Sequence, residues 1–159
     1  MTELLPAHIK VTEIEGLLNI IRDYGGPIRM SALASYTKEG VDRLLEVLRA
    51  ARVLGLINVK SGVVSVTGVG KELNLYDFQN DVRDHVAAVE PFKTSVRLLK
   101  KGNGMTTSQL LLALLKANIL AQYSSYDIEN IKWLLTHWGI RIGLFAYEAR
   151  NDRWKLKKH

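Results

Sequence analysis

Residues 37–67, TKEGVDRLLEVLRAARVLGLINVKSGVVSVT, decide the fold of this chain. In the first half, apolar residues recur at the three- and four-residue spacing of a helix that buries one face. Thr37 is a suitable N-cap for this helix, and Gly55 is a suitable end for it. The second half has two β-branched runs around Ser61-Gly62, which predicts a hairpin over 57–67. The apolar face predicted for the helix consists of Val41, Leu44, Leu45, Leu48 and Ala51.

Two shorter helices are predicted before this stretch. The first is capped by Thr12 and ends at Gly25-Gly26-Pro27, and its apolar positions are Ile14, Leu17, Leu18 and Ile21. After an extended segment at 27–29, the second has Ser31 as its cap and Met30, Leu33 and Ala34 as its apolar positions. Gly68 to Gly70 is predicted as a loop that leads into a helix over 71–80. A helix pair followed by a hairpin is the winged-helix arrangement.

The second half of the chain repeats this order. We predict a helix from Pro91 to Lys101, one over 108–120 capped by Thr106 or Thr107, and one from Ser124 or Ser125 to Gly139. A β-rich run at 140–147 and an alternating strand at 153–157 follow, joined by a turn at Asn151-Asp152. We therefore predict a mostly helical α+β protein with small hairpins. Its architecture is a tandem winged helix, with an N-terminal unit at 1–80 packed against a C-terminal unit at 81–159.

Composition limits the class of protein. The chain has 159 residues, 47% of them hydrophobic and 24% charged, which is typical of a soluble globular protein. It has no cysteine, which excludes disulfides, thiolate zinc sites and cysteine nucleophiles. We find neither a secretory leader nor an apolar run near the roughly 20 residues that span a bilayer. A cytoplasmic protein without membrane insertion is expected.

The net charge of +6 is unevenly distributed. Residues 1–80 contain nine Lys/Arg and nine Asp/Glu, whereas residues 81–159 contain thirteen and seven. A basic half favours a surface that faces a polyanion. A short basic tail explains part of the excess equally well, since Arg153, Lys155, Lys157 and Lys158 lie near the C-terminus.

The sequence contains no recognisable catalytic or metal-binding motif. Gly70-Lys71 fails as a phosphate loop because Ser65 stands where the first glycine is needed and Glu72 replaces the Ser/Thr. The four histidines, His8, His85, His137 and His159, are not spaced as metal ligands. Asp81, Asp84 and His85 could share a helix face, but a solvated surface explains them as well. We expect no enzyme activity and no cofactor.

Twelve basic residues are candidate contacts to nucleic acid or to a partner. In the first unit, Glu39, Asp42 and Glu46 lie on the same 37–55 helix as the basic candidates. These carboxylates would weaken binding to phosphates. Trp138 is expected in the core, and for Trp133 core and surface are equally favoured. The candidates are Lys38, Arg43, Arg49 and Lys60 in the first unit, and Lys93, Arg97, Lys100, Lys101, Lys132, Arg150, Arg153 and Lys155 in the second.

Trp138-Gly-Ile-Arg-Ile-Gly-Leu-Phe-Ala-Tyr147 resembles the W-G-x-x-x-x-L-F-x-Y run of the AAA-associated C-terminal domain. That domain is appended to ATP-binding subunits of nitrate/sulfonate/taurine-type ABC transporters. Weaker similarities occur in order at 14–18 with 25–26, at 51–55 with 62 and 67–70, and at 90–92. The resemblance implies a non-catalytic partner of a nucleotide-binding domain, with no catalytic residues to carry over. This chain has no Walker motif, so it is similar to a stand-alone version.

Three hypotheses follow. The first is a winged-helix regulatory or protein-interaction module, the partner of an ABC-type ATPase subunit. The second is a DNA-binding transcriptional regulator, a homodimer that uses the basic C-terminal half on double-stranded DNA. An enzyme with an unrecognised site is the third and least favoured hypothesis. Steep salt dependence of binding would distinguish DNA recognition from an aromatic protein interface.

Overall fold

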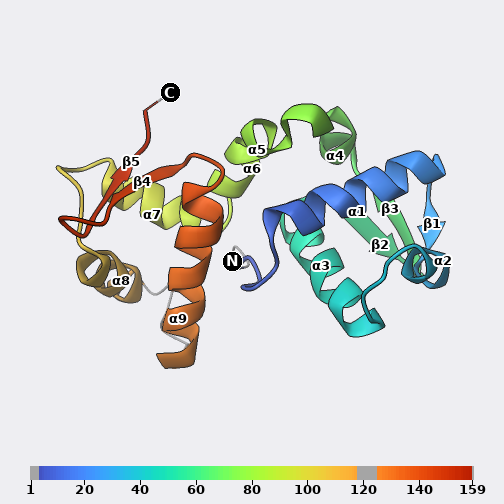
Figure 1. The fold of residues 1–159 in the computed structure, drawn as a ribbon, viewed down its shortest axis with the longest axis horizontal. Helices are drawn as coiled ribbons and strands as arrows, with labels where there is room; N and C mark the ends of the chain where they lie inside the picture. Colours follow the sequence, from blue (N-terminus) through green and yellow to red (C-terminus); the bar gives the residue numbers. More distant parts are fainter. Residues whose placement is uncertain (1–3, 118–124, 159) are drawn as a thin grey trace. The chain divides into compact units, whose positions relative to one another are not determined.

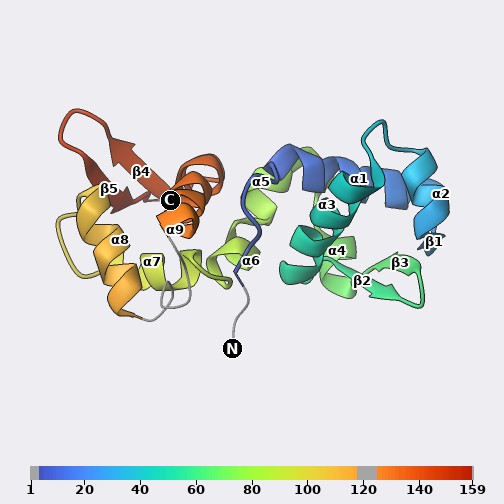
Figure 2. The ribbon, with the colours of Figure 1, turned by 90° about the horizontal axis from the view of Figure 1, so that it is seen from below.

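The structure is a computed structural model that describes residues 4–117 and 125–158. It is mostly helical, with two small antiparallel sheets (Figures 1 and 2). The chain forms two compact units, which we call the first unit, Ile9–Asp81, and the second unit, residues 4–8 together with the described residues from Val82 onward. Among the described residues, none belongs to a helix long and apolar enough to cross a membrane.

The first unit begins with α1 (Val11–Tyr24), β1 (Ile28–Arg29), α2 (Met30–Ser35) and α3 (Val41–Val53). The hairpin β2 (Ile57–Lys60) and β3 (Val63–Val66) follows, and α4 (Gly68–Glu72), a 3₁₀ helix (Leu75–Asp77) and α5 (Phe78–Asp81) complete the unit. The sheet is antiparallel in the order β1-β3-β2, with Ile28 opposite Val64 and Ile57 opposite Val66.

Local sequence explains these elements well. All four predicted apolar residues of α1 are buried, together with Val11. Gly25 ends the helix with a φ of 96°, a left-handed conformation that glycine adopts without strain. Ser61 and Gly62 both have positive φ, which is the geometry that a two-residue hairpin turn requires. The predicted hairpin and the extended segment before α2 are confirmed.

The predicted caps of the first three helices are wrong. The residues at the N-cap position are Lys10, Arg29 and Gly40, and none is Thr12, Ser31 or Thr37. The Thr37 hydroxyl instead donates to the Ala34 carbonyl at 3.1 Å, at the end of α2. Because Thr37 belongs to the turn after α2, α3 begins three residues later than the sequence pattern suggested.

The region after the hairpin also differs from its prediction. Gly68 to Gly70 is the first turn of α4 and not a loop, because Thr67 caps it by accepting a bond from the Gly70 N–H at 3.0 Å. An added Cβ at Gly70 would lie 2.3 Å from the Leu56 carbonyl oxygen, so the helix sits directly against the hairpin. Leu73 is extended, and therefore no continuous helix spans 71–80.

The second unit contains α6 (Arg83–Ala87), α7 (Phe92–Leu99), α8 (Thr107–Lys116), α9 (Ser125–Leu134), a π-helical turn (Leu135–Ile140), β4 (Phe145–Glu148) and β5 (Arg153–Leu156). Of the two predicted caps, Thr106 and Thr107, it is Thr106 that caps α8, since its hydroxyl accepts from the Gln109 N–H at 3.1 Å. The end of the predicted 108–120 helix and Ser124 lie outside the described residues. Before α8, Met105 forms an isolated antiparallel bridge with Trp154 of β5.

The run from Trp138 to Tyr147 contributes Trp138, Ile142 and Phe145 to the core of the second unit. Trp138 is fully buried, which confirms its predicted place. The Phe145 ring lies 6.3 Å from the ring of Phe92 and 6.2 Å from that of Trp154. A Cβ at Gly139 would lie 2.3 Å from the Phe145 ring. The prediction of a β-rich segment from Ile140 is wrong, because helical turns continue through Ile140 and β4 starts only at Phe145.

Candidate functional site

The outer surface of α3 is more apolar than its sequence pattern predicted. Val41 and Leu45 were expected in the core, but they are 59% and 44% exposed. The buried residues of α3 are Leu44, Val47, Leu48, Ala50 and Ala51. Because α3 begins at Val41 and packs through Leu44, Val47 and Leu48, its 41/45 edge is left facing solvent. Exposed aliphatic residues one turn apart form a small apolar strip.

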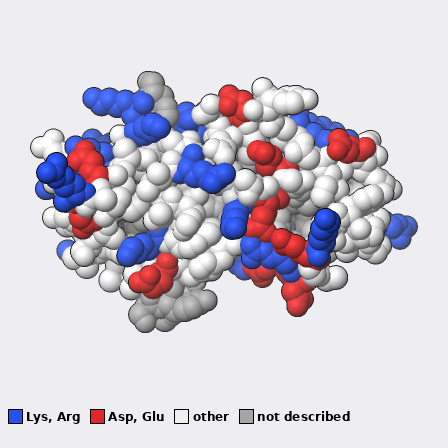
Figure 3. Space-filling view, in the orientation of Figure 1, with Lys and Arg blue, Asp and Glu red and all other residues white. Residues whose placement is uncertain are grey.

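The charged residues beside this strip largely neutralise one another. The Glu13 carboxylate of α1 accepts bonds from Arg43 Nε at 2.9 Å and Nη2 at 2.5 Å, and Glu39 lies 3.5 Å from Arg43 Nε. Figure 3 shows acidic and basic side chains interleaved over the region of α3. Arg43 is therefore paired with carboxylates of its own unit and is not available to a phosphate backbone.

This arrangement shifts two pKa values. Partial burial acts to raise the pKa of Glu13, but the bonds from Arg43 and from the Lys10 N–H outweigh it and hold the pKa below its usual value. The bond to Glu13 raises the pKa of Arg43, assisted by the charges of Glu39 and Glu46. Both groups thus stay ionised together, and the pair links α1 to α3.

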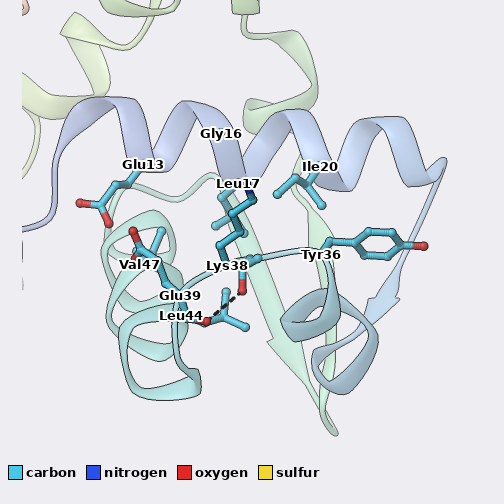
Figure 4. Close-up of a pocket in the computed structure, with 10 residues that line it drawn as sticks. Glu13, Gly16, Leu17, Ile20, Tyr36, Lys38, Glu39, Leu44 and Val47 are labelled. Carbon is cyan, nitrogen blue, oxygen red and sulfur yellow. Dashed lines mark hydrogen bonds between the residues drawn. The ribbon is translucent and has the colours of Figure 1, made fainter.

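A groove lies beside this ion pair, between α1 and the segment that joins α2 to α3 (Figure 4). Leu17, Leu44 and Val47 form its apolar base, and Gly16 and Ile20 of α1 lie along one side. Glu13 and Glu39 lie toward one end, and Tyr36 extends toward the other. The Tyr36 ring also makes an edge contact with Tyr24, at a centroid distance of 6.3 Å, and both rings are more than half exposed.

Of the predicted contacts in the first unit, Lys38 lines this groove and Arg43 forms the ion pair described above. Arg49 is exposed on α3, and Lys60 is exposed at the end of β2. Sequence reasoning missed Gly16, Ile20 and Tyr36. A glycine within a strongly periodic helix is the signal that could have indicated them.

In the second unit, four predicted contacts form one basic cluster. Lys93 and Arg97 are exposed on α7, and Lys100 and Lys101 are exposed just beyond its end. Their spacing places them along one side of the helix. No ion pair to another described residue involves any of the four. This surface is available to an anion.

The remaining predicted contacts do not form a comparable surface. Lys132 is exposed on α9, where Trp133, half-buried, stacks on His137 at 4.5 Å. Arg150 is exposed in the β4–β5 turn. Lys155 lies 3.1 Å from Glu148, and Arg153 donates to the Gly104 carbonyl at 3.2 Å. Lys155 and Arg153 are therefore bound to groups of the hairpin and of the loop beside it.

A polar cluster that the sequence did not indicate connects this hairpin to α8. Asp152 accepts from the Thr107 hydroxyl at 2.6 Å and from the Tyr147 hydroxyl at 2.9 Å, and the Trp154 indole donates to Thr107 at 2.8 Å. The bond from Thr107, followed by that from Tyr147, lowers the pKa of Asp152. Each member has a structural partner, so we assign the cluster a role in folding.

No group of three or more His, Asp or Glu side chains that could hold a metal ion occurs within residues 4–117 and 125–158. The Gly70-Lys71 pair is part of α4. The Gly70 carbonyl accepts a bond from the Arg22 guanidinium, which also donates to the Leu73 carbonyl at 2.7 Å. These backbone groups are engaged in packing α4 against α1.

The family model of the C-terminal AAA-associated domain matches residues 31–148, which is most of the chain. The chain belongs to this family. By its description, the C-terminal AAA-associated domain is associated with AAA ATPases. No curated protein and no solved structure gives a significant match. The family match includes α3, the basic cluster of α7 and the Trp138–Tyr147 run, whereas α1 precedes it.

Proposed function

We propose that this AAA-associated domain is a non-enzymatic interaction module whose partner is an ATPase subunit of the ABC type. The observation that carries the proposal is the surface of α3, where exposed Val41 and Leu45 lie beside charges that are already paired. Apolar side chains surrounded by satisfied polar groups are typical of the centre of a protein interface. Membership of the AAA-associated family supports an ATPase as the class of partner.

We also infer that both units are winged helices. The first unit has the order α1-β1-α2-α3-β2-β3, and β1 pairs with the last strand, β3. In the second unit, α7 is followed by Met105, α8, α9, β4 and β5, and Met105 pairs with the last strand, β5. The bridge of Met105 thus corresponds to β1, which supports a repeat of one plan.

Affinity capture from cells of the source organism tests the ATPase proposal. We would compare the tagged wild-type chain with Leu45→Glu, and with Asn58→Glu, which adds the same charge at an exposed position of β2. We expect the wild type and Asn58→Glu to enrich a protein that carries Walker motifs, and Leu45→Glu to lose it. The proposal is wrong if no nucleotide-binding protein is captured by the wild type and by Asn58→Glu and lost with Leu45→Glu.

A DNA-binding regulator is the second candidate, favoured by the four exposed cations of the α7 cluster. Such a protein would contact phosphates, and a homodimer would place two clusters on one duplex. Fluorescence anisotropy with mixed-sequence duplex DNA at low and at near-physiological salt tests this candidate. Micromolar binding that persists at the higher salt would support it, and binding lost there would reject it.

A further inference from the structure

The side of α7 that faces solvent consists of cations alone. Between residues 90 and 101, the exposed residues are Lys93, Arg97, Lys100 and Lys101. Arg97 is three or four residues away from each of the others, a spacing that brings side chains together on a helix. Like charges at this spacing destabilise a helix, and an anion bound along them would remove that repulsion.

Neighbouring carboxylates do not offset this charge. The sequence from 91 to 126 contains five Lys/Arg and no Asp/Glu. Glu90 precedes α7, but it is buried, and its carboxylate accepts the Thr94 N–H at 2.9 Å and the Thr94 hydroxyl at 2.8 Å. The helices α6 and α8 and the strand β5 pack against α7. Neither α8 nor β5 contains an acidic residue, and Asp84 of α6 forms no ion pair with the basic cluster. The basic cluster is therefore suited to an anionic ligand.

The length of the basic cluster indicates a ligand with several anionic groups. Lys93 and Lys101 are separated by about 12 Å along the helix axis, at 1.5 Å per residue. A single phosphate would reach only part of this stripe. The surface of a nucleic acid or of an anionic bilayer presents phosphates along all of it. The basic cluster thus matches an extended phosphate surface better than a small anion.

Exposed leucines on the neighbouring helix favour a bilayer over a nucleic acid. Figure 2 shows α8 beside α7, against which it packs. Leu112 and Leu115 of α8 are 51% and 41% exposed, and Lys116 next to them is exposed as well. A nucleic acid contacts proteins mainly through polar and charged groups, and it offers leucines little apolar surface. A bilayer has acyl chains directly below its phosphates, so it accepts basic and apolar side chains at one surface.

We propose that the basic cluster of α7 binds the surface of a bilayer that contains anionic phospholipids. Its four cations lie at the headgroup phosphates, and Leu112 and Leu115 reach the boundary between headgroups and acyl chains. The contact is peripheral and needs no membrane-spanning helix. It goes beyond the proposed function, because it concerns the second unit and requires no ATPase.

Co-sedimentation of the full chain with lipid vesicles tests the proposal. One set of vesicles is phosphatidylcholine alone, and the other is phosphatidylcholine mixed with phosphatidylglycerol, both at near-physiological salt. The cluster variant replaces Lys93, Arg97, Lys100 and Lys101 by alanine. The matched control replaces four exposed cations of the first unit by alanine and so removes the same net charge; these are Lys38, Arg49, Arg52 and Lys60. All eight positions are exposed, so both variants are expected to fold, which circular dichroism checks.

We expect the wild type and the control to bind the vesicles that contain phosphatidylglycerol and to leave phosphatidylcholine vesicles unbound. Each cation near an anionic bilayer contributes about fivefold to binding, so the cluster variant should bind at least about tenfold more weakly. A second variant, Leu112→Gln with Leu115→Gln, keeps good helix formers in α8. It should weaken vesicle binding and leave binding to mixed-sequence duplex DNA unchanged.

Four results would overturn the proposal. The wild type could fail to bind anionic vesicles at near-physiological salt. The cluster variant and the control could lose binding equally, which would assign it to net charge. Duplex DNA could bind the wild type at the same salt while vesicles do not, which would make a nucleic acid the ligand. Vesicle binding could be unchanged in the leucine variant, which would remove the reason to prefer a bilayer.

Discussion

At the scale of single residues, the glycines of this chain have opposite physical roles. Gly70 and Gly139 are close-approach positions, where an added Cβ would lie 2.3 Å from the Leu56 carbonyl oxygen and from the Phe145 ring, respectively. Gly16 faces open space. The same residue type therefore permits tight packing at two positions and leaves a groove open at the third.

Alanine substitutions distinguish the two roles. Gly70→Ala should lower the free energy of unfolding by about 1–3 kcal/mol, because backbone atoms of the hairpin would have to move. Gly16→Ala should raise it by roughly 0.5–1 kcal/mol, because alanine restricts the unfolded chain and favours the helix. Urea unfolding followed by circular dichroism measures both. Destabilisation by Gly16→Ala would mean that the groove is tighter than the structure indicates.

Trp138 is the largest fully buried side chain among the described residues. Trp138→Ala should lower the free energy of unfolding by about 3–5 kcal/mol, since a cavity would replace an indole in the core of the second unit. Trp133→Ala, at a half-buried position, is the comparison variant. It should lower the free energy of unfolding clearly less than Trp138→Ala does. If urea unfolding gave the same loss of free energy for the two variants, the placement of Trp138 in the core would be contradicted.

At the scale of elements, the Glu13–Arg43 pair fixes α1 against α3. The helices also share buried apolar contacts through Leu17, Leu44 and Val47. The ion pair is partly exposed, so its contribution to stability is modest, about 0.2–1 kcal/mol. The pair also neutralises the charge of Arg43.

The pH dependence of stability reports on this pair. The folded pKa of Glu13 lies below its ordinary value of 4.5, so the ion pair stabilises the protein above about pH 4.5. That contribution is lost as the pH falls through the folded pKa. Glu13→Gln should therefore be less stable than wild type at pH 7, and the difference should shrink as the pH falls below about 4.5. The measurement is urea unfolding at pH 7, 5, 4 and 3.

Glu15→Gln is the control for this series. It removes a carboxylate from the same part of α1 but leaves the two Arg43 bonds to Glu13 in place. A Glu13→Gln deficit that stays constant from pH 7 to pH 3 would show that the amide disturbs packing and that ionisation is not the cause.

At the scale of the whole molecule, the excess positive charge and the apolar strip of α3 occur in different units. The first unit is electrically balanced and carries the apolar strip of α3 and the groove, whereas the second carries the excess positive charge. If the α7 cluster contacts phosphates, the logarithm of DNA affinity should fall with the logarithm of salt concentration. Four phosphate contacts give a slope of about −3 to −4.

Substitution of Lys93, Arg97, Lys100 and Lys101 by alanine should reduce this slope by nearly its full value, as measured by anisotropy between low and physiological salt. The control is the same number of changes at exposed cations of the first unit, Lys38, Arg49, Arg52 and Lys60. An equal loss of binding in both variants would assign the interaction to net charge and not to the cluster.

The sequence by itself determined the elements whose signals are local. The face of α1, the Ser61-Gly62 turn, the Thr106 cap and the burial of Trp138 all follow from spacing and residue type, and they are confirmed. The resemblance carried by the Trp138–Tyr147 run also identified the family.

Tertiary structure decided the features that depend on which neighbour a residue meets. The periodicity of α3 shows that one face is apolar, but only its packing shows that Val41 and Leu45 lie at the edge, in solvent. Arg43 is a candidate contact in the sequence, but it is neutralised in the structure because α1 brings Glu13 within hydrogen-bonding distance. Gly16 becomes informative only when the space beside it is known. Periodicity specifies a face, whereas burial and pairing depend on contacts between residues far apart in the chain.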